Sequence, residues 1–432
     1  MKALVLAAAA MISAPVSAQT VAVVGGTLAI GDGSQPVANG TVVFRDGRIV
    51  AAGASVAIPA GATVVDAHGK WIAAGIVAGF TNLGLVDADG VEESNDERAG
   101  KSPFNAAIDI APWINPSADV IGNERLGGVT RAVVAPGSAG SIFAGQGAVI
   151  DLGSGAAPVT KARAFQYVEL GEDGGRQAGG SRPAAFAMFR DALAQAADYR
   201  RSPASFGGRE KDSLLKRGDA EALLAVIDGR TPLLVHVERA SDILAVLALP
   251  ATYPKLRLIL LGATEGWTVA PQIEAAHVPV IAAAIADLPA AFEKVAATES
   301  NVGRMTRAGI PVAISTVGAN TAPGEHILTQ LAGNLVGFAK LPGATGLDWG
   351  QAFATITSKP AQAMGMDGEI GSLRPGRRAD VVLWDGDPLE LSSNTVAIWI
   401  DGRAQPMTSR QTQLRDRYRV PGEGALPKAY EH

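Results

Sequence analysis

PLLVH at residues 232–236 begins a series of four short apolar runs, and each run is followed by a segment with helical spacing. The other three runs are LRLILL (256–261), VPVIAA (278–283) and PVAIST (311–316). The helical segments that follow the four runs cover residues 241–249, 267–276, 288–297 and 326–338. Repeated strand–helix units predict a parallel sheet covered by helices. Four consecutive units favour an eight-unit (β/α)8 TIM-type barrel, because an open doubly wound sheet normally carries a Gly-rich dinucleotide loop early in the chain.

Both ends of the chain consist of short strand-like runs separated by glycine, as in residues 40–53 and 379–402. The pair Asp46-Gly47 is a strong signal for a tight hairpin. Two β-rich ends therefore bracket the barrel. Residues 411–432 are polar and contain Pro and Gly, which predicts a loosely held tail.

The composition excludes several classes of protein. Lys and Arg number 37 against 42 Asp and Glu, a net charge of −5, which argues against a nucleic-acid partner or an anionic membrane surface. The chain has no cysteine, so a disulfide scaffold, a thiolate metal site and a cysteine nucleophile are excluded.

The first residues predict export. Lys2 precedes the apolar run 3–12, and Val16-Ser17-Ala18 forms a small-residue cleavage site, so residues 1–18 are predicted to be a signal peptide. An N-terminal membrane anchor is the alternative, but this run is shorter than the roughly 20 residues that a spanning helix needs. We expect no membrane association after cleavage, and a periplasmic protein if the source is Gram-negative.

Several segments resemble the metal-dependent amidohydrolase superfamily. Residues 38–53 (ANGTVVFRDGRIVAAG) and 65–75 (VDAHGKWIAAG) resemble its N-terminal β-sandwich. Residues 358–365 (SKPAQAMG), 370–384 (IGSLRPGRRADVVLW) and 399–402 (WIDG) look like its last barrel helix and closing strands. The short motifs GVT (128–130), APGS (135–138) and GQG (145–147) are similar to the imidazolonepropionase-like branch.

The resemblance implies a barrel over residues 75–367 and a small β-sandwich built from residues 19–74 and 368–410. It also implies hydrolysis of carbon–nitrogen bonds other than peptide bonds, by a water molecule that zinc or another divalent metal activates.

The expected metal ligands can be compared with this chain one position at a time. The His-x-His pair that ends the first strand of the family is matched by Phe80 and Asn82. His236 matches the strand-five histidine, but Gly262 stands at the strand-six histidine. Val317 stands where strand eight should carry an aspartate. Only His236 is retained of five positions, and a catalytic zinc site needs about three protein ligands. We therefore predict that the metal centre is largely lost and that no cofactor is held.

A few polar residues are further candidates. Glu238 lies two residues after His236 and projects to the same side of the strand, so the two could form an acid–base pair. The alternative for His236 is a core histidine with a hydrogen-bond partner. Glu265 and His326 are possible pocket residues, with helix capping and packing as the alternatives.

Three functions stay open from the sequence. The first is a non-catalytic protein, or a partner subunit that pairs with an intact amidohydrolase or with a second copy of itself. The second is an active hydrolase of cyclic or acyl amides that uses His236 and Glu238 with little or no metal. The third is a small-molecule binding module in which Phe80 and Val317 line an apolar pocket.

Overall fold

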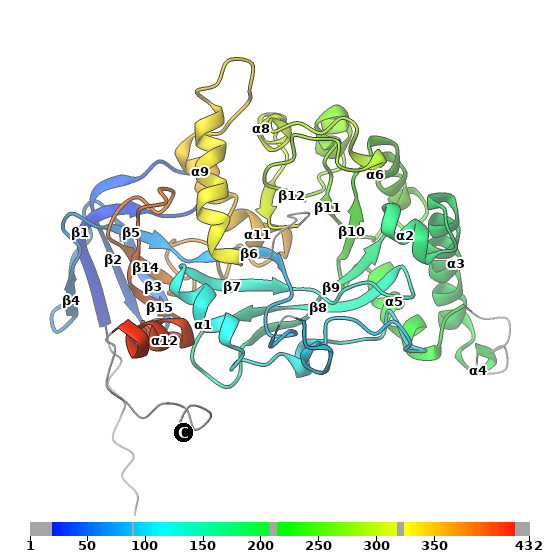
Figure 1. The fold of residues 1–432 in the computed structure, drawn as a ribbon, viewed down its shortest axis with the longest axis horizontal. Helices are drawn as coiled ribbons and strands as arrows, with labels where there is room; N and C mark the ends of the chain where they lie inside the picture. Colours follow the sequence, from blue (N-terminus) through cyan, green and yellow to red (C-terminus); the bar gives the residue numbers. More distant parts are fainter. Residues whose placement is uncertain (1–19, 89, 207–213, 318–323, 420–432) are drawn as a thin grey trace, which may run out of the picture.

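The computed structural model describes residues 20–88, 90–206, 214–317 and 324–419. Two eight-stranded sheets lie side by side, one forming a barrel and the other built from both ends of the chain (Figure 1). The predicted signal peptide lies outside the described residues. Within the described ranges, the helices are all too short or too polar to cross a membrane.

The barrel sheet has the strand order β13-β12-β11-β10-β9-β8-β7-β6. Its strands are β6 (Ile76–Thr81), β7 (Val129–Val134), β8 (Phe143–Asp151), β9 (Val159–Glu169), β10 (Leu233–Val237), β11 (Leu258–Gly262), β12 (Val280–Ala283) and β13 (Val312–Ser315). Backbone at residues 355–356 joins the two edge strands, because Ile314 N donates to Thr355 O at 3.1 Å and Val77 N donates to Ile356 O at 2.8 Å. The barrel is thereby nearly closed, and the predicted TIM-type fold is confirmed.

One strand departs from the regular repeat. All neighbouring strands from β9 to β13 pair in parallel, but β8 runs antiparallel to both β7 and β9. The connections on either side of β8, residues 135–142 and 152–158, contain no helix. They are shorter than the dozen or more residues that a parallel crossover requires, so the strand must reverse.

Alternate residues of the strands fill the barrel interior. Val77, Phe165, Leu234 and Ile281 belong to one buried cluster, which continues into Met364 next to α11 (Ser358–Ala363). Lys161 Nζ donates to Met364 O at 3.0 Å near the start of β9. Side chains therefore fill the barrel at the N-terminal ends of its strands.

Three of the four predicted helices follow their strands. They appear as α6 (Ala240–Leu247), α7 (Ala270–Ala275) and α9 (Leu328–Phe338). The remaining helices are α1 (Asp119–Leu126), α2 (Glu172–Gln177), α3 (Arg182–Arg201), α4 (Pro203–Phe206), α5 (Arg217–Ile227), α8 (Asn301–Arg307), α10 (Trp349–Ala354) and α12 (Arg410–Arg419).

The predicted helix over residues 288–297 is wrong. This segment contains only a 3-10 turn, Phe292–Lys294. Its large apolar side chains do not form a buried stripe, because Leu288, Phe292 and Val295 are 71%, 88% and 64% exposed. A short helix without a buried face is not stable in water, and the segment instead lies at the rim of the barrel.

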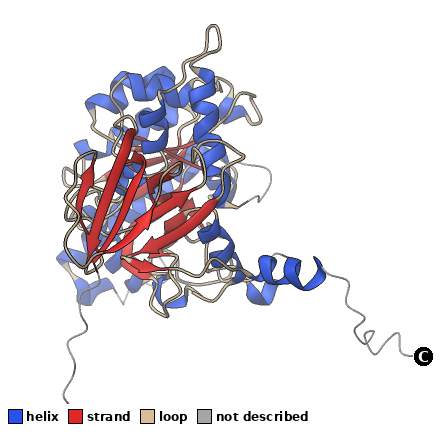
Figure 2. Ribbon diagram, turned by 90° about the vertical axis from the view of Figure 1, so that its left-hand side faces the viewer, coloured by secondary structure: helices blue, strands red, loops and turns tan. Residues whose placement is uncertain are grey.

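The second sheet has the order β16-β15-β14-β5-β1-β2-β3, with β4 also paired to β1 (Figure 2). Its strands are β1 (Thr20–Ala29), β2 (Val37–Arg45), β3 (Arg48–Gly53), β4 (Thr63–Asp66), β5 (Trp71–Ala74), β14 (Val381–Trp384), β15 (Thr395–Ile400) and β16 (Arg403–Ala404). The predicted hairpin joins β2 and β3, where Asp46 and Gly47 have φ values of 53° and 75°. Both residues adopt the positive φ that a tight two-residue hairpin turn demands.

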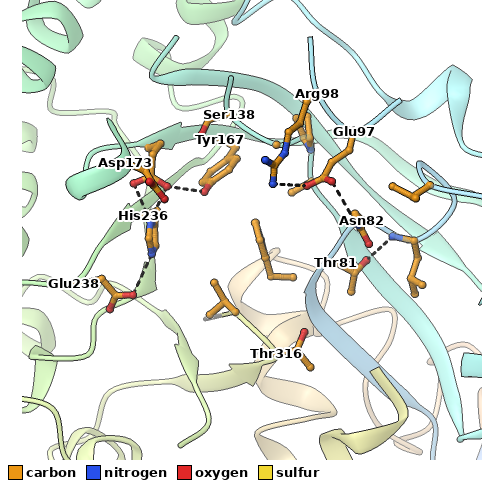
Figure 3. A pocket seen from close by; sticks show the side chains of 18 of the residues that line it. Thr81, Asn82, Glu97, Arg98, Ser138, Tyr167, Asp173, His236, Glu238 and Thr316 are labelled. Atoms are coloured by element: carbon orange, nitrogen blue, oxygen red, sulfur yellow. Dashed lines mark hydrogen bonds and ion pairs between the residues drawn. The ribbon is translucent and has the colours of Figure 1, made fainter. Parts of the chain in front are cut away.

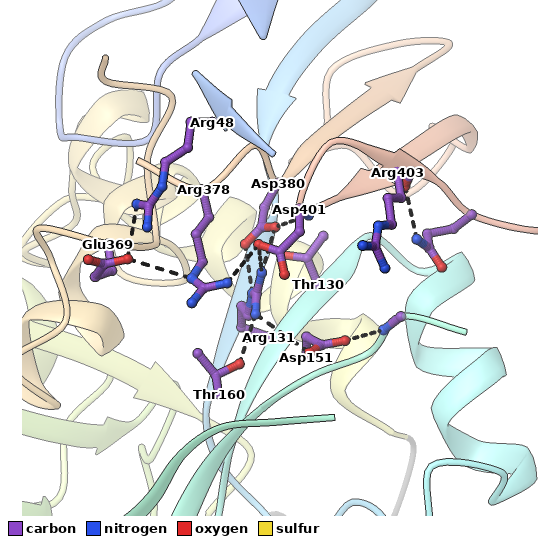
Figure 4. Close-up of polar contacts among 12 residues, drawn as sticks. Arg48, Thr130, Arg131, Asp151, Thr160, Glu369, Arg378, Asp380, Asp401 and Arg403 are labelled. Carbon is purple, nitrogen blue, oxygen red and sulfur yellow. Dashed lines mark hydrogen bonds and ion pairs between the residues drawn. The ribbon is translucent and has the colours of Figure 1, made fainter. Parts of the chain in front are cut away.

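A buried arginine connects the two sheets (Figure 4). The guanidinium of Arg131 in β7 is fully buried, and its Nε donates to Asp380 Oδ2 at 2.8 Å, just before β14. Its Nη2 also donates to Asp401 Oδ1 at 2.7 Å, just after β15. The barrel is thereby held against the C-terminal return of the second sheet.

The predicted C-terminal tail is a helix where it is described. Residues 410–419 form α12, which has no buried residue and projects from the body of the molecule (Figure 2). It is connected to α1 by an ion pair of 2.6 Å between Arg410 and Asp119. The rest of the predicted tail lies outside the described residues.

Candidate functional site

The open end of the barrel holds a cavity of about 1020 Å³. Its wall contains Glu169 from the end of β9, His236 from β10 and Val317 just after β13. Loop residues after β6 and the rim segment 291–294 complete the wall. Active sites of TIM barrels lie at this C-terminal face of the strands, so this cavity is the candidate site.

His236 lies between two carboxylates (Figure 3). Its Nδ1 is 2.7 Å from Glu169 Oε2, and its Nε2 is 3.1 Å from Glu238 Oε1. Glu169 is placed there because it pairs with His236 across β9 and β10. Glu238 is two residues beyond His236, and its side chain lies on the same side of the chain, as expected.

The two carboxylates keep the imidazole protonated. Burial by itself lowers the pKa of His236, but Glu169 and Glu238 outweigh it and hold the pKa well above its usual value. Burial likewise raises the pKa of Glu238, but His236 and Lys294 lower it to about 2. At neutral pH, His236 is therefore an imidazolium that donates from both ring nitrogens.

Lys294 completes a group that we call the mouth cluster: Glu169, His236, Glu238 and Lys294. Its Nζ lies 3.1 Å from Glu238 Oε1. Two cations thus face two carboxylates, so the cluster is neutral overall. Backbone N–H groups satisfy further carboxylate oxygens, since Thr264 N donates to Glu238 at 2.8 Å and Gly171 N donates to Glu169 at 2.9 Å.

The first two family ligand positions carry no strong metal ligand. Phe80 packs edge to face against Tyr167, with ring centroids 5.4 Å apart. Tyr167 in turn donates from its hydroxyl to Glu169 Oε2 at 3.1 Å. Asn82 is exposed, and its Nδ2 donates to Glu97 at 3.4 Å. An aromatic ring and a neutral amide therefore occupy this side of the mouth.

The other two positions are apolar. Gly262 has φ +85°, and a Cβ there would lie 2.7 Å from the Glu238 carboxyl carbon. A larger side chain at this position would displace Glu238, so the glycine and the mouth cluster depend on each other. Val317 packs against the interior cluster of the barrel and lines the cavity.

Glu265 and His326 lie away from this cavity. Glu265 accepts hydrogen bonds from Ala240 N and Ala296 N, both at 3.0 Å, and so holds two loops together. His326 lines a separate cavity of about 510 Å³, where its backbone N donates to Glu124 at 2.6 Å. Both side chains thus have local structural partners.

Sequence reasoning missed Glu169 and Lys294 of the wall, and it weighed Glu325 only as a capping or packing residue. Glu169 could have been found, because Phe165, Tyr167 and Glu169 are every second residue of β9 and so lie on the same face of the strand. Lys294 had no signal, since it comes from a segment predicted as a helix. Glu325 accepts a hydrogen bond from the Thr316 hydroxyl at 3.0 Å, while its Oε2 is buried without a partner. Burial raises the pKa of Glu325 to about 8.

The geometry of the mouth cluster does not suit a metal ion. Glu169 and Glu238 lie at opposite edges of the imidazole ring, so the three side chains do not converge on one point. In the described part of the chain, no set of three or more His, Asp or Glu side chains is arranged to hold a metal.

Solved structures share this fold. An amidohydrolase from Thermotoga maritima is 21% identical, with a TM-score of 0.77, and the match covers 89% of this chain and 99% of that one. Molinate hydrolase is 19% identical with a TM-score of 0.53, over 96% of this chain and 99% of that one. At these identities the likeness concerns the fold.

Two curated proteins are similar in sequence. The amidohydrolase tasK of Hapsidospora irregularis is 25% identical over 383 residues, which is 81% of this chain but 38% of that protein. The imidazolonepropionase of Maricaulis maris is 29% identical over 198 residues, 45% of this chain and 44% of that protein. Each match thus spans less than half of the relative's own length.

The model of the amidohydrolase family matches residues 159–409, more than half of the chain. This range runs from β9 through the mouth cluster to the last strands of the second sheet. The chain therefore belongs to the amidohydrolase family.

Proposed function

We propose that this chain is an exported, non-catalytic member of the amidohydrolase family whose barrel mouth binds a small molecule without hydrolysing it. One observation carries the proposal: both ring nitrogens of His236 are engaged with carboxylates, at 2.7 and 3.1 Å. A protonated imidazole has no lone pair for a metal ion. The one histidine retained from the family pattern is therefore committed to an internal ion pair.

The other ligand positions support the loss of the metal centre. Phe80, Gly262 and Val317 offer no donor atom, and Asn82 offers a neutral amide oxygen. Lys294 places a positive charge directly against Glu238, where a metal would have to compete with it. These residues do not fit a divalent metal.

Metal-free hydrolysis by His236 and Glu238 is less well supported. A general base works best when its pKa lies near the operating pH. The pKa of His236 lies well above its usual value and that of Glu238 is about 2, so the former is already protonated and the latter is a weak base.

A role as partner subunit is a second proposal, and it rests on the rim. Leu288, Phe292 and Val295 expose large apolar side chains on the segment that also carries Lys294. Exposed apolar clusters on soluble proteins often mark interaction surfaces. Co-purification with an intact amidohydrolase, or a dimer in light scattering that Phe292→Ser dissolves, would support it; a lone monomer in both assays would remove it.

Metal analysis tests the main proposal. The purified full chain is incubated with zinc or manganese, dialysed and measured by elemental analysis, and it is then assayed with N-acyl amino acids, hydantoins and imidazolone-like rings. We expect far less than one ion per chain and no turnover. Near-stoichiometric metal that is lost in His236→Gln but kept in the control His277→Gln would overturn the proposal, as would turnover that depends on His236.

N-terminal sequencing of the protein from an expressing Gram-negative host tests export. We expect a mature chain that begins at Gln19 in the periplasmic fraction. An uncleaved chain in the cytoplasm would refute this part alone.

A further inference from the structure

Carboxyl groups outnumber cationic groups on the wall of the barrel-mouth cavity. Eight Asp and Glu side chains line it, against two arginines, Lys294 and His236. A concave wall of one predominant sign focuses the electrostatic field and raises the local concentration of ions of opposite charge. The imbalance favours a positively charged ligand.

Each cation of the wall already has a carboxylate partner. His236 and Lys294 belong to the mouth cluster. Arg98 lies 3.6 Å from Glu97, and Arg176 forms an ion pair with Asp173. Four carboxyl groups of the wall are left without an ion-pair partner in the described chain.

Two of these four are buried, and they are the most informative. Glu293 and Glu325 are 6% and 8% exposed. Among the described residues, Glu293 Oε2 accepts one hydrogen bond, from the backbone N of Glu172 at 2.7 Å. Glu325 accepts from Thr316, and its Oε2 has no partner at all among the described residues. A buried carboxyl group without a counter-charge is costly, and a bound cation would compensate it.

Apolar surface lies on the same wall. Phe80 is only partly buried, with its ring held edge to face against Tyr167 at 5.4 Å, and Val317 lines the cavity as well. Figure 3 shows Tyr167, His236 and Glu238 across the cavity from Thr81 and Asn82, with Thr316 at its lower edge. An aromatic face can attract an alkylammonium group as well as contact its apolar part.

We propose that the barrel mouth is a binding site for a small organic cation, an ammonium compound with an apolar or aromatic substituent. Its ammonium group is held by the carboxyl groups of Glu293 and Glu325, which ionise beside the bound cation, and its apolar part contacts Phe80 and Val317. This inference rests on the proposed function in one respect, namely that the ligand is bound and not consumed.

The test compares three probes of similar shape and different charge: benzylammonium, benzyl alcohol and benzoate. Each is titrated into the full chain in buffer with a chelator at neutral pH and low salt, by calorimetry and ligand-observed NMR. We expect benzylammonium to bind at least tenfold more tightly than the other two, with an affinity that falls as salt is added.

Variants locate the site. Glu293→Gln and Glu325→Gln should each weaken benzylammonium binding about tenfold, since an amide cannot ionise, whereas a buried carboxyl group can lose its proton beside a bound cation. Phe80→Leu should weaken benzylammonium more than methylammonium. Glu92→Gln is the matched control, because this exposed glutamate lies outside the cavity wall, and thermal unfolding of every variant verifies that it is folded.

Several outcomes would overturn the inference: no probe bound, equal binding of all three, a preference for benzoate, or unchanged binding in both glutamine variants. Zinc chloride alone is a fourth probe. If zinc saturates the site and competes with benzylammonium, the inference is also overturned. If metal-loaded protein hydrolyses amides and still binds benzylammonium, only the proposed function is refuted. If the protein holds no metal, hydrolyses no amide and does not bind benzylammonium, only the proposed cation site is refuted.

Discussion

Arg131→Met removes the charge that holds the barrel against the second sheet. Burial by itself lowers the pKa of Arg131, but Asp380, Asp401 and Asp151 outweigh it, so the pKa is raised and the group stays charged at every accessible pH. Methionine fills much of the same volume without the charge. The variant therefore leaves the three carboxylates facing a neutral side chain.

The structure sets the expected size of the effect. The side chain of Arg131 is fully buried, and that of Asp380 is 6% exposed. Arg131 donates to Asp380 from Nε at 2.8 Å and from Nη2 at 2.9 Å. Removing one partner of such a pair costs about 3–5 kcal/mol in the free energy of unfolding. Adding Asp380→Asn should recover about 1–3 kcal/mol of this loss, because the most buried of the three carboxylates is then replaced by a neutral amide.

Thermal unfolding followed by tryptophan fluorescence measures the effect, since Trp71, Trp384 and Trp399 lie in the second sheet. Arg163→Met is the matched control: its ion pair with Asp109 is as short, 2.7 Å, but Arg163 is 65% exposed, so it should cost at most about 1 kcal/mol. The reasoning is refuted if Arg131→Met and Arg163→Met lower the melting temperature equally, or if Asp380→Asn deepens the loss.

Three further perturbations probe the barrel mouth. Because burial raises the pKa of Glu325 to about 8, the folded chain binds a proton that the unfolded chain releases above its ordinary pKa of 4.5, so stability falls as pH rises between these values. Glu325→Gln should melt like the parent near pH 5 and at a higher temperature near pH 9, where its free energy of unfolding should exceed that of the parent by up to roughly 5 kcal/mol. Parallel pH profiles of the two proteins would contradict this. Gly262→Ala should lower the free energy of unfolding by about 1–3 kcal/mol, and with it the melting temperature, since φ is +85° and the new Cβ would clash with Glu238. An unchanged melting temperature would contradict the clash. Glu169→Gln should lower the pKa of His236 in an NMR titration, because it removes the carboxylate at 2.7 Å. An unshifted titration would contradict this.

The barrel itself was predictable because its second half repeats a local pattern. Apolar runs such as 232–236 and 256–261 alternate with helical spacing, and this alternation depends only on near neighbours in the chain. In segment 288–297, the local pattern predicts the wrong structure. Its apolar spacing is compatible with a helix, but the fold leaves Phe292 exposed and directs Lys294 into the mouth, so no helix forms.

The candidate site was predicted in part. His236 and Glu238 were named from their spacing, and the structure brings them together. The alternation of Phe165, Tyr167 and Glu169 places Glu169 on the inner face of β9, but its contact with His236 depends on the register between β9 and β10, which no local pattern specifies. The reversed direction of β8 was missed for the same reason, since only the lengths of its two connections impose it.

By itself, the sequence determined which kinds of side chain stand at the barrel mouth: a phenylalanine, an amide, a glycine and a valine at the positions that the resemblance matches to metal ligands. Residue identity is a local property and needs no coordinates. Only the tertiary structure decided which groups surround the histidine, because Glu169 and Lys294 of the mouth cluster come from separate segments of the chain. Charge interactions act across space within a few ångströms, whereas Glu169, His236 and Lys294 are dozens of residues apart along the chain.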